Sequence, residues 1–182
     1  MKPLSFSSNI EEIEEAAKLK FEIETEVNEL YVRDILCREL YNVAYFCEYD
    51  EKIVDSQINP HLEEDKIERA KLLGKTSDFF DKFMLEDVYT RQFVIQMKYD
   101  DDPDKASCLS LVQFSVRKGF LNMNVYVRSQ NFDHNFKYDN QTYMKMMRLV
   151  IEKIDNSWGE WMPVQFGQIN VFINSLHKFI EK

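Results

Sequence analysis

The 182-residue sequence is poor in the residues that mark linkers, leaders and membrane segments. Four glycines and four prolines leave no room for a long flexible linker, so we expect one domain spanning residues 1–182. No apolar run approaches the roughly 20 residues of a membrane span, and the N-terminus lacks the basic and apolar regions of a signal peptide. We therefore expect no membrane association and no secretory leader.

Cysteine is also scarce, and its spacing fits neither a disulfide framework nor a zinc site. Cys37, Cys47 and Cys108 are odd in number and widely separated, with no CxxC pair. This pattern is typical of a reducing compartment, and we expect a cytoplasmic protein.

Basic residues are too few for a broad nucleic-acid surface. The 23 lysines and arginines are outnumbered by 32 carboxylates, which gives a net charge of −9. Neutralising a phosphate backbone needs a basic surface, so no nucleic-acid partner is expected. A small anionic ligand remains compatible, because a pocket can gather two or three arginines against an acidic background.

The N-terminal quarter predicts a helix, a strand and a second helix. Ser8 and Glu11 form a capping box that predicts a helix start. Apolar residues then alternate with glutamates, which predicts a strand over residues 20–28 with one wet face. From Leu30 the apolar spacing lengthens and predicts a helix to about Phe46, with Cys37 and Cys47 as buried thiols in or beside it.

Short helices, strands and loops are expected over the rest of the chain outside its centre. We expect a loop over residues 49–60, helices over 60–74 and 77–83, a strand over 93–97, and a solvated acidic loop over 100–104. Further on, we expect a core helix over 143–154, a turn at 158–161 and a strand over 169–173.

The most informative stretch is residues 106–129, with the sequence ASCLSLVQFSVRKGFLNMNVYVRS. Two β-patterned runs flank the turn Arg117-Lys118-Gly119, which predicts an antiparallel hairpin. Cys108 opens the first strand and Arg128 closes the second. Because these two ends of a hairpin lie on the same side, the thiol and the guanidinium could share one cleft.

This stretch resembles the core of the thymidylate synthases, a family that includes the deoxycytidylate hydroxymethylases. The resemblance rests on Cys108, the following Gln113-Phe114, the glycine turn, the LNMNVYV strand and Arg128-Ser129. Two weaker fragments keep the family order: Thr90-Arg91-Gln92, and GQINVFIN at residues 167–174. The resemblance covers residues 89–174 and implies an α+β fold with a mixed, mostly antiparallel sheet flanked by helices.

The resemblance also implies a reaction. In the family, the cysteine thiolate adds to carbon 6 of a pyrimidine nucleotide, and carbon 5 then attacks the methylene group of methylene-tetrahydrofolate. Cys108 would be this nucleophile, with Arg128 as the cation that lowers its pKa. The implied function is a C5 methyl- or hydroxymethyltransferase for pyrimidine deoxynucleoside monophosphates. Taken alone, Cys108 would more often be a structural thiol.

Several further residues are implied to bind the nucleotide. Arg128 and Ser129 correspond to the phosphate grip, and Arg91 to an arginine donated across a homodimer interface built through a sheet face. Gln113 would lie near the phosphate or base. The alternatives for these residues are surface ion pairs and ordinary strand hydrogen bonds.

Asp139 corresponds to the position at which the family reads the base. An ionised carboxylate only accepts hydrogen bonds, which suits the amino group of cytosine better than the carbonyl group of uracil. The alternative is that Asp139 is the N-cap of a helix beginning at Asn140. The two interpretations are equally supported by the sequence.

The departures from the family pattern support a second function. Asn131 stands where the family has Asp, and Asn170 and Phe172 replace a His and a Tyr that bind the sugar. Nucleotide binding at these positions is therefore expected to be altered. The alternative to an enzyme is a catalytically degenerate nucleotide-binding or interaction protein of the same fold. An unrelated α+β binding domain is the third possibility.

Overall fold

The computed structural model describes residues 4–7, 9–23, 27–32, 35–60, 62–97 and 107–180. The elements are β1 (Leu4–Ser7), α1 (Ile10–Glu22), β2 (Asn28–Val32), β3 (Ile35–Glu48), α2 (Glu51–Asp55), α3 (Glu63–Phe83), β4 (Val94–Gln96), β5 (Leu109–Arg117), β6 (Phe120–Asn131), α4 (Phe132–Trp158), a 3-10 turn (Gly159–Trp161) and β7 (Gln165–Phe179).

The strands form one seven-stranded sheet in the order β1-β3-β7-β6-β5-β4, with β2 also paired to β3. The β1–β3 and β6–β7 pairings are parallel, and the other pairings are antiparallel. The expected α+β fold with a mixed, mostly antiparallel sheet is therefore confirmed.

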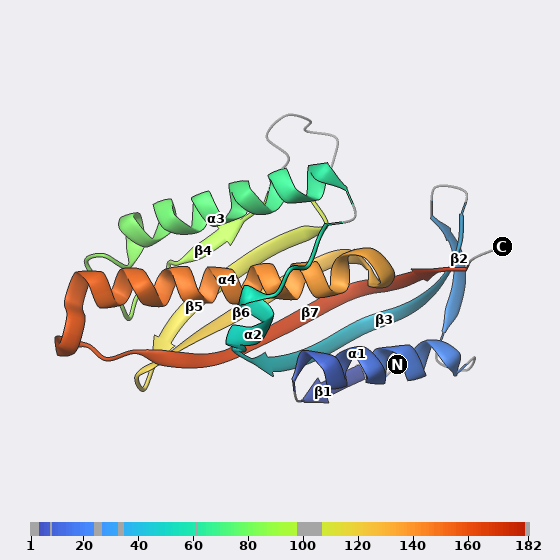
Figure 1. Ribbon diagram of the computed structural model, residues 1–182, viewed down its shortest axis with the longest axis horizontal. Coiled ribbons are helices and arrows are strands. Elements are labelled where there is room, and N and C mark those ends of the chain that lie inside the picture. The colour runs from blue at the N-terminus through green and yellow to red at the C-terminus, as the bar shows by residue number, and fades with distance from the viewer. Residues whose placement is uncertain are drawn as a thin grey trace.

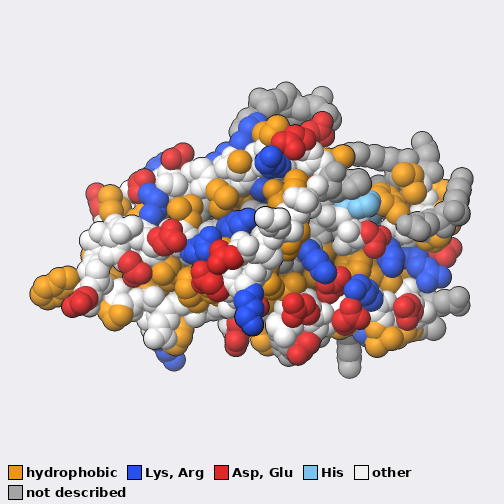
Figure 2. Space-filling view, viewed as in Figure 1, with side chains coloured by type: hydrophobic (Ala, Val, Ile, Leu, Met, Phe, Trp, Pro, Cys, Tyr) orange, Lys and Arg blue, Asp and Glu red, His pale blue; other side chains and the backbone are white. Residues whose placement is uncertain are grey.

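The helices cover one face of this sheet (Figure 1). α4 lies across β6 and β7, α3 runs beside α4, and α1 packs on β3. Acidic and basic side chains are interleaved over these helices, and the described side chains in this view form no continuous basic patch (Figure 2). The opposite face of the sheet is left without a helix among the described elements.

The central hairpin forms as its sequence predicts. Lys118 and Gly119 have φ values of 53° and 78°, which is the backbone of a two-residue turn that matches the twist of the flanking strands. Val112, Phe114, Met123 and Val125 are fully buried between the sheet and the helices. β6 passes directly into α4, where Asn131 caps the helix by accepting a hydrogen bond from the His134 amide at 3.1 Å.

The prediction for residues 20–28 was wrong. α1 extends to Glu22 and β2 begins only at Asn28, so the alternation of Phe21 and Ile23 does not mark a strand. The cap of α1 is Asn9, whose side chain accepts a hydrogen bond from the Glu12 amide at 3.0 Å. Ser8 lies outside the described residues.

The helix predicted from Leu30 to Phe46 was also wrong, because this segment forms β2 and the long strand β3. Leu40 and Val43 are buried three positions apart, which imitates a helix. The cause is a break in strand alternation at Asn42, where φ is 54°. Cys37 and Cys47 are nevertheless buried, as expected.

Elsewhere the helices are longer than expected. α3 runs unbroken through Gly74, so the two helices predicted over 60–74 and 77–83 are one, and α2 occupies part of the expected loop. α4 and β7 contain the helix and strand predicted over 143–154 and 169–173 and extend them at both ends. β4 confirms the strand predicted over 93–97. The acidic loop at 100–104 lies outside the described residues.

A line of irregularities crosses the sheet from β3 to β5. In β3 both Tyr41 and Asn42 are exposed although adjacent residues of a regular strand face opposite ways. In β5 the pairing with β6 shifts between Leu109 and Leu111. In β6 Val127 and Gln130 are both buried. On the far side of these irregularities, the side chains of each strand lie on the face opposite to the one that regular alternation would give them.

A second irregularity explains Gly167. Between Leu121 and Met123 the β6–β7 register shifts, so that Gly167 and Gln168 of β7 lie opposite Asn122 alone. A Cβ atom on Gly167 would meet the Leu121 carbonyl oxygen at 2.5 Å and Asn122 Oδ1 at 2.6 Å. Only glycine allows the two backbones to approach this closely.

The Gly167→Ala substitution should therefore lower the free energy of unfolding by about 1–3 kcal/mol, because the added methyl group forces β6 and β7 apart. The matched control is Gly74→Ala in α3, where a Cβ atom would meet nothing within 4 Å. That change should stabilise the protein by about 0.5–1 kcal/mol. Urea unfolding measures both. Equal stability of Gly167→Ala and the unmodified protein would contradict the assignment.

Candidate functional site

Cys108 and Arg128 lie together at the open end of the hairpin. The Arg128 backbone N–H donates a hydrogen bond to the Cys108 carbonyl oxygen at 2.7 Å, beyond the last regular pair of the two strands. Cys108 is exposed, whereas Cys37 and Cys47 are buried. The backbones of Cys108 and Arg128 are thus adjacent, as the hairpin predicts, and the reactivity of the thiol stays a prediction.

The surroundings of Cys108 act on its thiol in opposite directions. Although the residue is exposed, the protein around the sulfur desolvates the thiolate, and this raises the pKa of Cys108 above its ordinary value. The charge of Arg128 opposes the rise and Asp139 adds to it. Arg69 and Glu68 make smaller contributions, lowering and raising the pKa respectively. Without a ligand, the thiol is therefore less acidic than the sequence led us to expect.

Asp139 is the centre of a buried polar network beside this thiol. Its Oδ1 accepts hydrogen bonds from Arg69 Nε at 2.8 Å and Arg69 Nη2 at 2.5 Å, and its Oδ2 accepts one from Gln130 Nε2 at 2.7 Å. Burial raises the pKa of Asp139, and the Arg69 charge and the hydrogen bonds oppose that rise. Asp139 lies within α4, whose N-cap is Asn131, so its interpretation as a helix cap was wrong.

Arg69 was missed from the sequence, although one signal could have found it. It is 7% exposed and lies on the buried face of α3 with Leu72, Thr76 and Phe80. An arginine on an apolar helical stripe requires a buried anion, because an isolated charge is costly to bury. The partner, Asp139, is 70 positions away and could not be identified without the fold.

A pocket of about 480 Å³ lies on the helix-free face, along the line of irregularities. It brings together two of the predicted nucleotide-binding residues, Arg128 and Phe172. The Phe172 ring stacks on Tyr126 with centroids 5.1 Å apart, and Asn174 and Ser110 add polar groups. The pocket thus combines a cation, an aromatic wall and hydrogen-bonding side chains, and its Arg128 is bonded through the backbone to Cys108.

Two other predicted residues are occupied by contacts within the protein. Ser129 Oγ lies 3.4 Å from Nδ1 of His177, a buried imidazole whose pKa is lowered chiefly by burial. Asn170 Nδ2 donates a hydrogen bond to Asn124 Oδ1 at 3.0 Å. Asn131 is the N-cap of α4, where its side chain accepts a hydrogen bond from the His134 amide.

Gln113 and Arg91 are not brought to Cys108 within one chain. Gln113 lies in mid-strand, opposite Val94 of β4 and Asn124 of β6. Arg91 is exposed in the segment that leads into β4. The neighbouring Tyr89 carbonyl oxygen accepts a hydrogen bond from Arg117 at 3.3 Å, so Arg91 lies toward the turn end of the hairpin.

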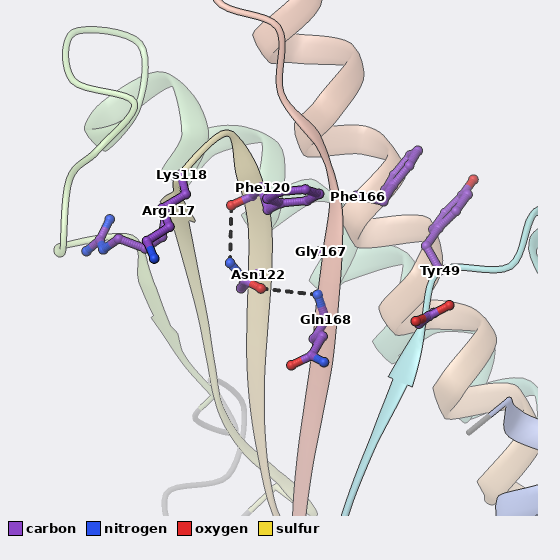
Figure 3. Close-up of a pocket in the computed structure, with 9 residues that line it drawn as sticks. Tyr49, Arg117, Lys118, Phe120, Asn122, Phe166, Gly167 and Gln168 are labelled. Carbon is purple, nitrogen blue, oxygen red and sulfur yellow. Dashed lines mark hydrogen bonds between the residues drawn. The ribbon is translucent and has the colours of Figure 1, made fainter. Parts of the chain in front are cut away.

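A larger pocket of about 610 Å³ lies at that turn end, beside the Gly167 irregularity (Figure 3). Tyr49 and Phe166 are stacked along it with centroids 3.7 Å apart, and Asn122 bridges the Phe120 carbonyl oxygen and the Gln168 amide. At about 3.3 Å per residue, the length of β5 separates it from Cys108 by well over 20 Å. It is therefore not part of the Cys108 site.

Two comparisons with known proteins found no match. No protein-family model and no curated protein matches the chain. Within the described ranges no helix is long and apolar enough to cross a membrane. The same residues contain no group of three or more His, Cys, Asp or Glu side chains able to hold a metal ion.

Iodoacetamide should label Cys108 and spare Cys37 and Cys47, because only Cys108 is exposed. Because burial raises the pKa of the Cys108 thiol above its ordinary value, the thiol is mostly protonated at neutral pH, and the labelling rate should keep rising with pH above neutrality. Arg128→Met should slow labelling by roughly twofold to tenfold at a fixed pH, since it removes a charge that favours the thiolate.

The matched control for the labelling is Arg117→Met, which removes an exposed arginine at the other end of the hairpin. It should leave the rate at Cys108 unchanged. Rates are read by mass mapping of the alkylated peptides. Faster labelling of Cys37, or no effect of Arg128→Met, would contradict the electrostatic assignment.

Proposed function

We propose that the protein binds a pyrimidine deoxynucleoside monophosphate at the Cys108–Arg128 end of the hairpin and is a C5 methyl- or hydroxymethyltransferase resembling the thymidylate synthases. The observation that carries this proposal is the 2.7 Å hydrogen bond from the Arg128 amide to the Cys108 carbonyl oxygen. It places the backbones that carry the proposed nucleophile and the proposed phosphate-binding side chain on neighbouring strand ends. The sequence resemblance gives the same two residues these roles.

The pocket beside Arg128 supports a nucleotide as the ligand. A guanidinium group binds phosphate oxygens in pairs, and aromatic rings such as Tyr126 and Phe172 offer a flat surface to a sugar or base. Its volume of about 480 Å³ lies within the range of small-molecule sites. The phosphate would lie at Arg128 and the ring beside Tyr126 and Phe172, at the strand end that carries Cys108.

In the proposed step, the Cys108 thiol gives its proton to solvent and its sulfur forms a bond to ring carbon 6. The electron pair of the C5–C6 double bond moves onto C5 and the C4 carbonyl oxygen, as an enolate. Carbon 5 is then the nucleophile for a one-carbon donor. A phosphate at Arg128 would offset that cation, so the thiolate would need stabilisation from the other groups around it.

Methylene-tetrahydrofolate is the donor that the sequence resemblance implies. The described side chains whose charges reach Cys108 are Arg69, Arg128, Asp139 and Glu68. None of these four is aromatic, and the aromatic pair beside Arg128, Tyr126 and Phe172, is already assigned to the nucleotide. We therefore derive no step through folate.

A second candidate function is nucleotide binding without turnover. It is favoured by the raised pKa of Cys108 and by the side chains of Asn170 and Ser129, which contact Asn124 and His177. A protonated thiol and missing sugar contacts would weaken the chemical step more than the binding of the phosphate.

We also propose a homodimer built through the helix-free face of the sheet. Tyr126 and Phe172 lie on that face with 43% and 41% of their surfaces exposed, which is costly for a stacked aromatic pair in water. Arg91 lies far from Cys108 of its own chain, so it would reach the phosphate site of the partner. The outcome is two sites, each completed by an arginine from the other subunit.

The function is tested by two measurements on the same nucleotides. Calorimetry with deoxyuridylate and deoxycytidylate should give binding that weakens by about tenfold to a hundredfold in Arg128→Met and is unchanged in Arg117→Met.

Proton NMR in heavy water should show exchange of the C5 hydrogen, because reversible sulfur addition makes C5 basic. Cys108→Ser should abolish exchange and preserve binding. Binding without exchange in the unmodified protein supports the non-catalytic function, and absence of binding rejects both.

The dimer is tested by complementation. Arg91→Ala and Arg128→Met should each weaken binding when studied alone. Mixing the two variants should restore tight binding in about a quarter of the sites, because half of the dimers are mixed and each has one intact site. Phe46→Lys, at a side chain on the helix-free face that is 38% exposed and lies outside the pocket, should abolish both dimerisation and recovery, whereas Trp161→Lys, at a side chain that is already 94% exposed, should not. A monomer at micromolar concentration in sedimentation, with no recovery on mixing, would refute the shared site.

A further inference from the structure

The pocket at the turn end of the hairpin lies on the rim of the sheet. Here β3 ends at Glu48, β6 begins at Phe120 and β7 begins at Gln165. The volume of about 610 Å³ lies within the range of small-molecule sites. None of the residues with a proposed role in nucleotide binding lines this pocket, so its side chains are available for a separate function.

Aromatic rings form one wall of the pocket. Tyr49 and Phe166 are stacked with centroids 3.7 Å apart and an angle of 4° between the ring planes. Phe120, which precedes the strand neighbour of Phe166, is 44% exposed and continues the row of rings (Figure 3). Three rings from three strands therefore present apolar faces and edges to one space.

The Tyr49 ring is held by a polar chain that ends on α4. The Tyr49 hydroxyl group donates to Glu51 Oε2 at 2.9 Å, and Glu51 Oε1 accepts from Arg148 Nη1 at 3.2 Å. Burial and the bond to Glu51 raise the pKa of Tyr49 to about 12, so the phenol stays protonated at neutral pH. Since Arg148 belongs to α4, the ring lies on the helix side of the rim, away from the face proposed for the homodimer.

The space beside the rings is kept open by the backbone. Asn122 Oδ1 accepts a hydrogen bond from the Gln168 amide at 3.1 Å, and Asn122 Nδ2 donates to the Phe120 carbonyl oxygen at 3.2 Å. Gly167, between these strands, has no side chain that could fill the pocket, and the close approach of β6 excludes one. A ligand would therefore enter a preformed site and lose little affinity to ordering of the protein.

Negative charge gathers at the Tyr49 end of the pocket. Glu48, Asp50 and Glu51 place three carboxylates within four positions around this ring. Asp50 caps α2 and Glu51 is shared between Tyr49 and Arg148. Glu48 is exposed in the pocket and has no hydrogen bond or ion pair with any described residue. A cation at this end would be attracted by the Glu48 carboxylate and by the faces of the rings.

The two basic residues of the pocket stand at its other end. Arg117 Nη1 donates to the Val116 and Tyr89 carbonyl oxygens, at 2.5 Å and 3.3 Å. The charged ends of Arg117 and Lys118 are directed away from the aromatic rings (Figure 3). The pocket is thus polarised, and its aromatic end is the negative one.

We infer that this pocket binds a small organic ammonium compound, whose cationic head lies between the Glu48 carboxylate and the rings of Tyr49 and Phe166. A quaternary ammonium group suits such a site best, because it has no N–H groups that would need hydrogen-bond acceptors. The body of the ligand would extend along Phe120. The net charge of −9 favours the approach of a cation. The inference is independent of the proposed nucleotide site, which lies at the opposite end of β5.

The test compares choline with 3,3-dimethyl-1-butanol, a neutral compound of the same shape in which carbon replaces the nitrogen. Titration followed by the NMR shifts of the Gly167 and Gln168 amides should give a Kd for choline on the order of 1 mM, as expected for one carboxylate and aromatic faces at a partly exposed site. The neutral compound should bind at least about fivefold more weakly, because it lacks the charge. Equal affinities of the two compounds would overturn the inference.

Two variants test the residues that would hold the head and body of the ligand. Glu48→Gln should weaken choline binding by about fivefold to tenfold and leave the neutral compound unchanged. Phe120→Leu should weaken choline binding by about threefold. Both side chains are exposed, as are those of the matched controls Glu86→Gln and Tyr31→Leu, which lie outside the pocket and should change neither affinity. Choline affinity that survives Glu48→Gln would reject the site.

A third variant distinguishes a cation site from an anion site. Lys118→Met removes a positive charge, so choline affinity should stay the same or rise by up to about threefold, whereas an anion would bind more weakly. Inorganic phosphate should leave the Gly167 and Gln168 amides unshifted. Phosphate shifts at these amides that Lys118→Met abolishes, with no shift by choline, would assign the pocket to anions and overturn the inference.

Discussion

The carboxylate of Asp139 is buried inside α4 and needs partners for its charge. The arrangement of the candidate site depends on the side chains that supply them. Asp139 draws Arg69 from α3 and Gln130 from β6, so three elements far apart in the sequence are fixed to one another through a single side chain. Breaking one partner of such a pair typically costs about 3–5 kcal/mol, because the remaining charge is left without compensation. The wall next to Cys108 therefore depends on a buried ion pair as well as on apolar packing.

Much of the central fold could be predicted because its determinants are local. The turn at Lys118 and Gly119, the alternation in β6 and the apolar spacing of α4 each lie within a few residues of the structure they specify. β3 could not be predicted in this way. Its burial changes face at Asn42, and a strand that changes face produces a spacing of three that is typical of a helix. Only pairing with β7 decides between the two.

In the candidate site, too, the local features could be predicted, and the features that depend on distant contacts could not. Hairpin geometry alone places Cys108 beside Arg128, and the structure agrees. The surroundings of the thiol depend on contacts between distant elements, so neither the rise in its pKa nor the engagement of Asp139 could be predicted from spacing. Ser129 and Asn170 were expected to meet a ligand, and each contacts a strand neighbour that the sequence does not indicate.

The direct passage of β6 into α4 has a consequence for the order in which the chain folds. β5, β6 and α4 follow one another with only a two-residue turn between them, so residues 109–158 can bury their shared apolar face at a small cost in loop-closure entropy. β3 pairs with β7 across more than a hundred residues, and that pairing closes a long loop. During synthesis the hairpin and its helix would leave the ribosome before β7, and β7 would join a preformed edge of β6 and bring β3 with it.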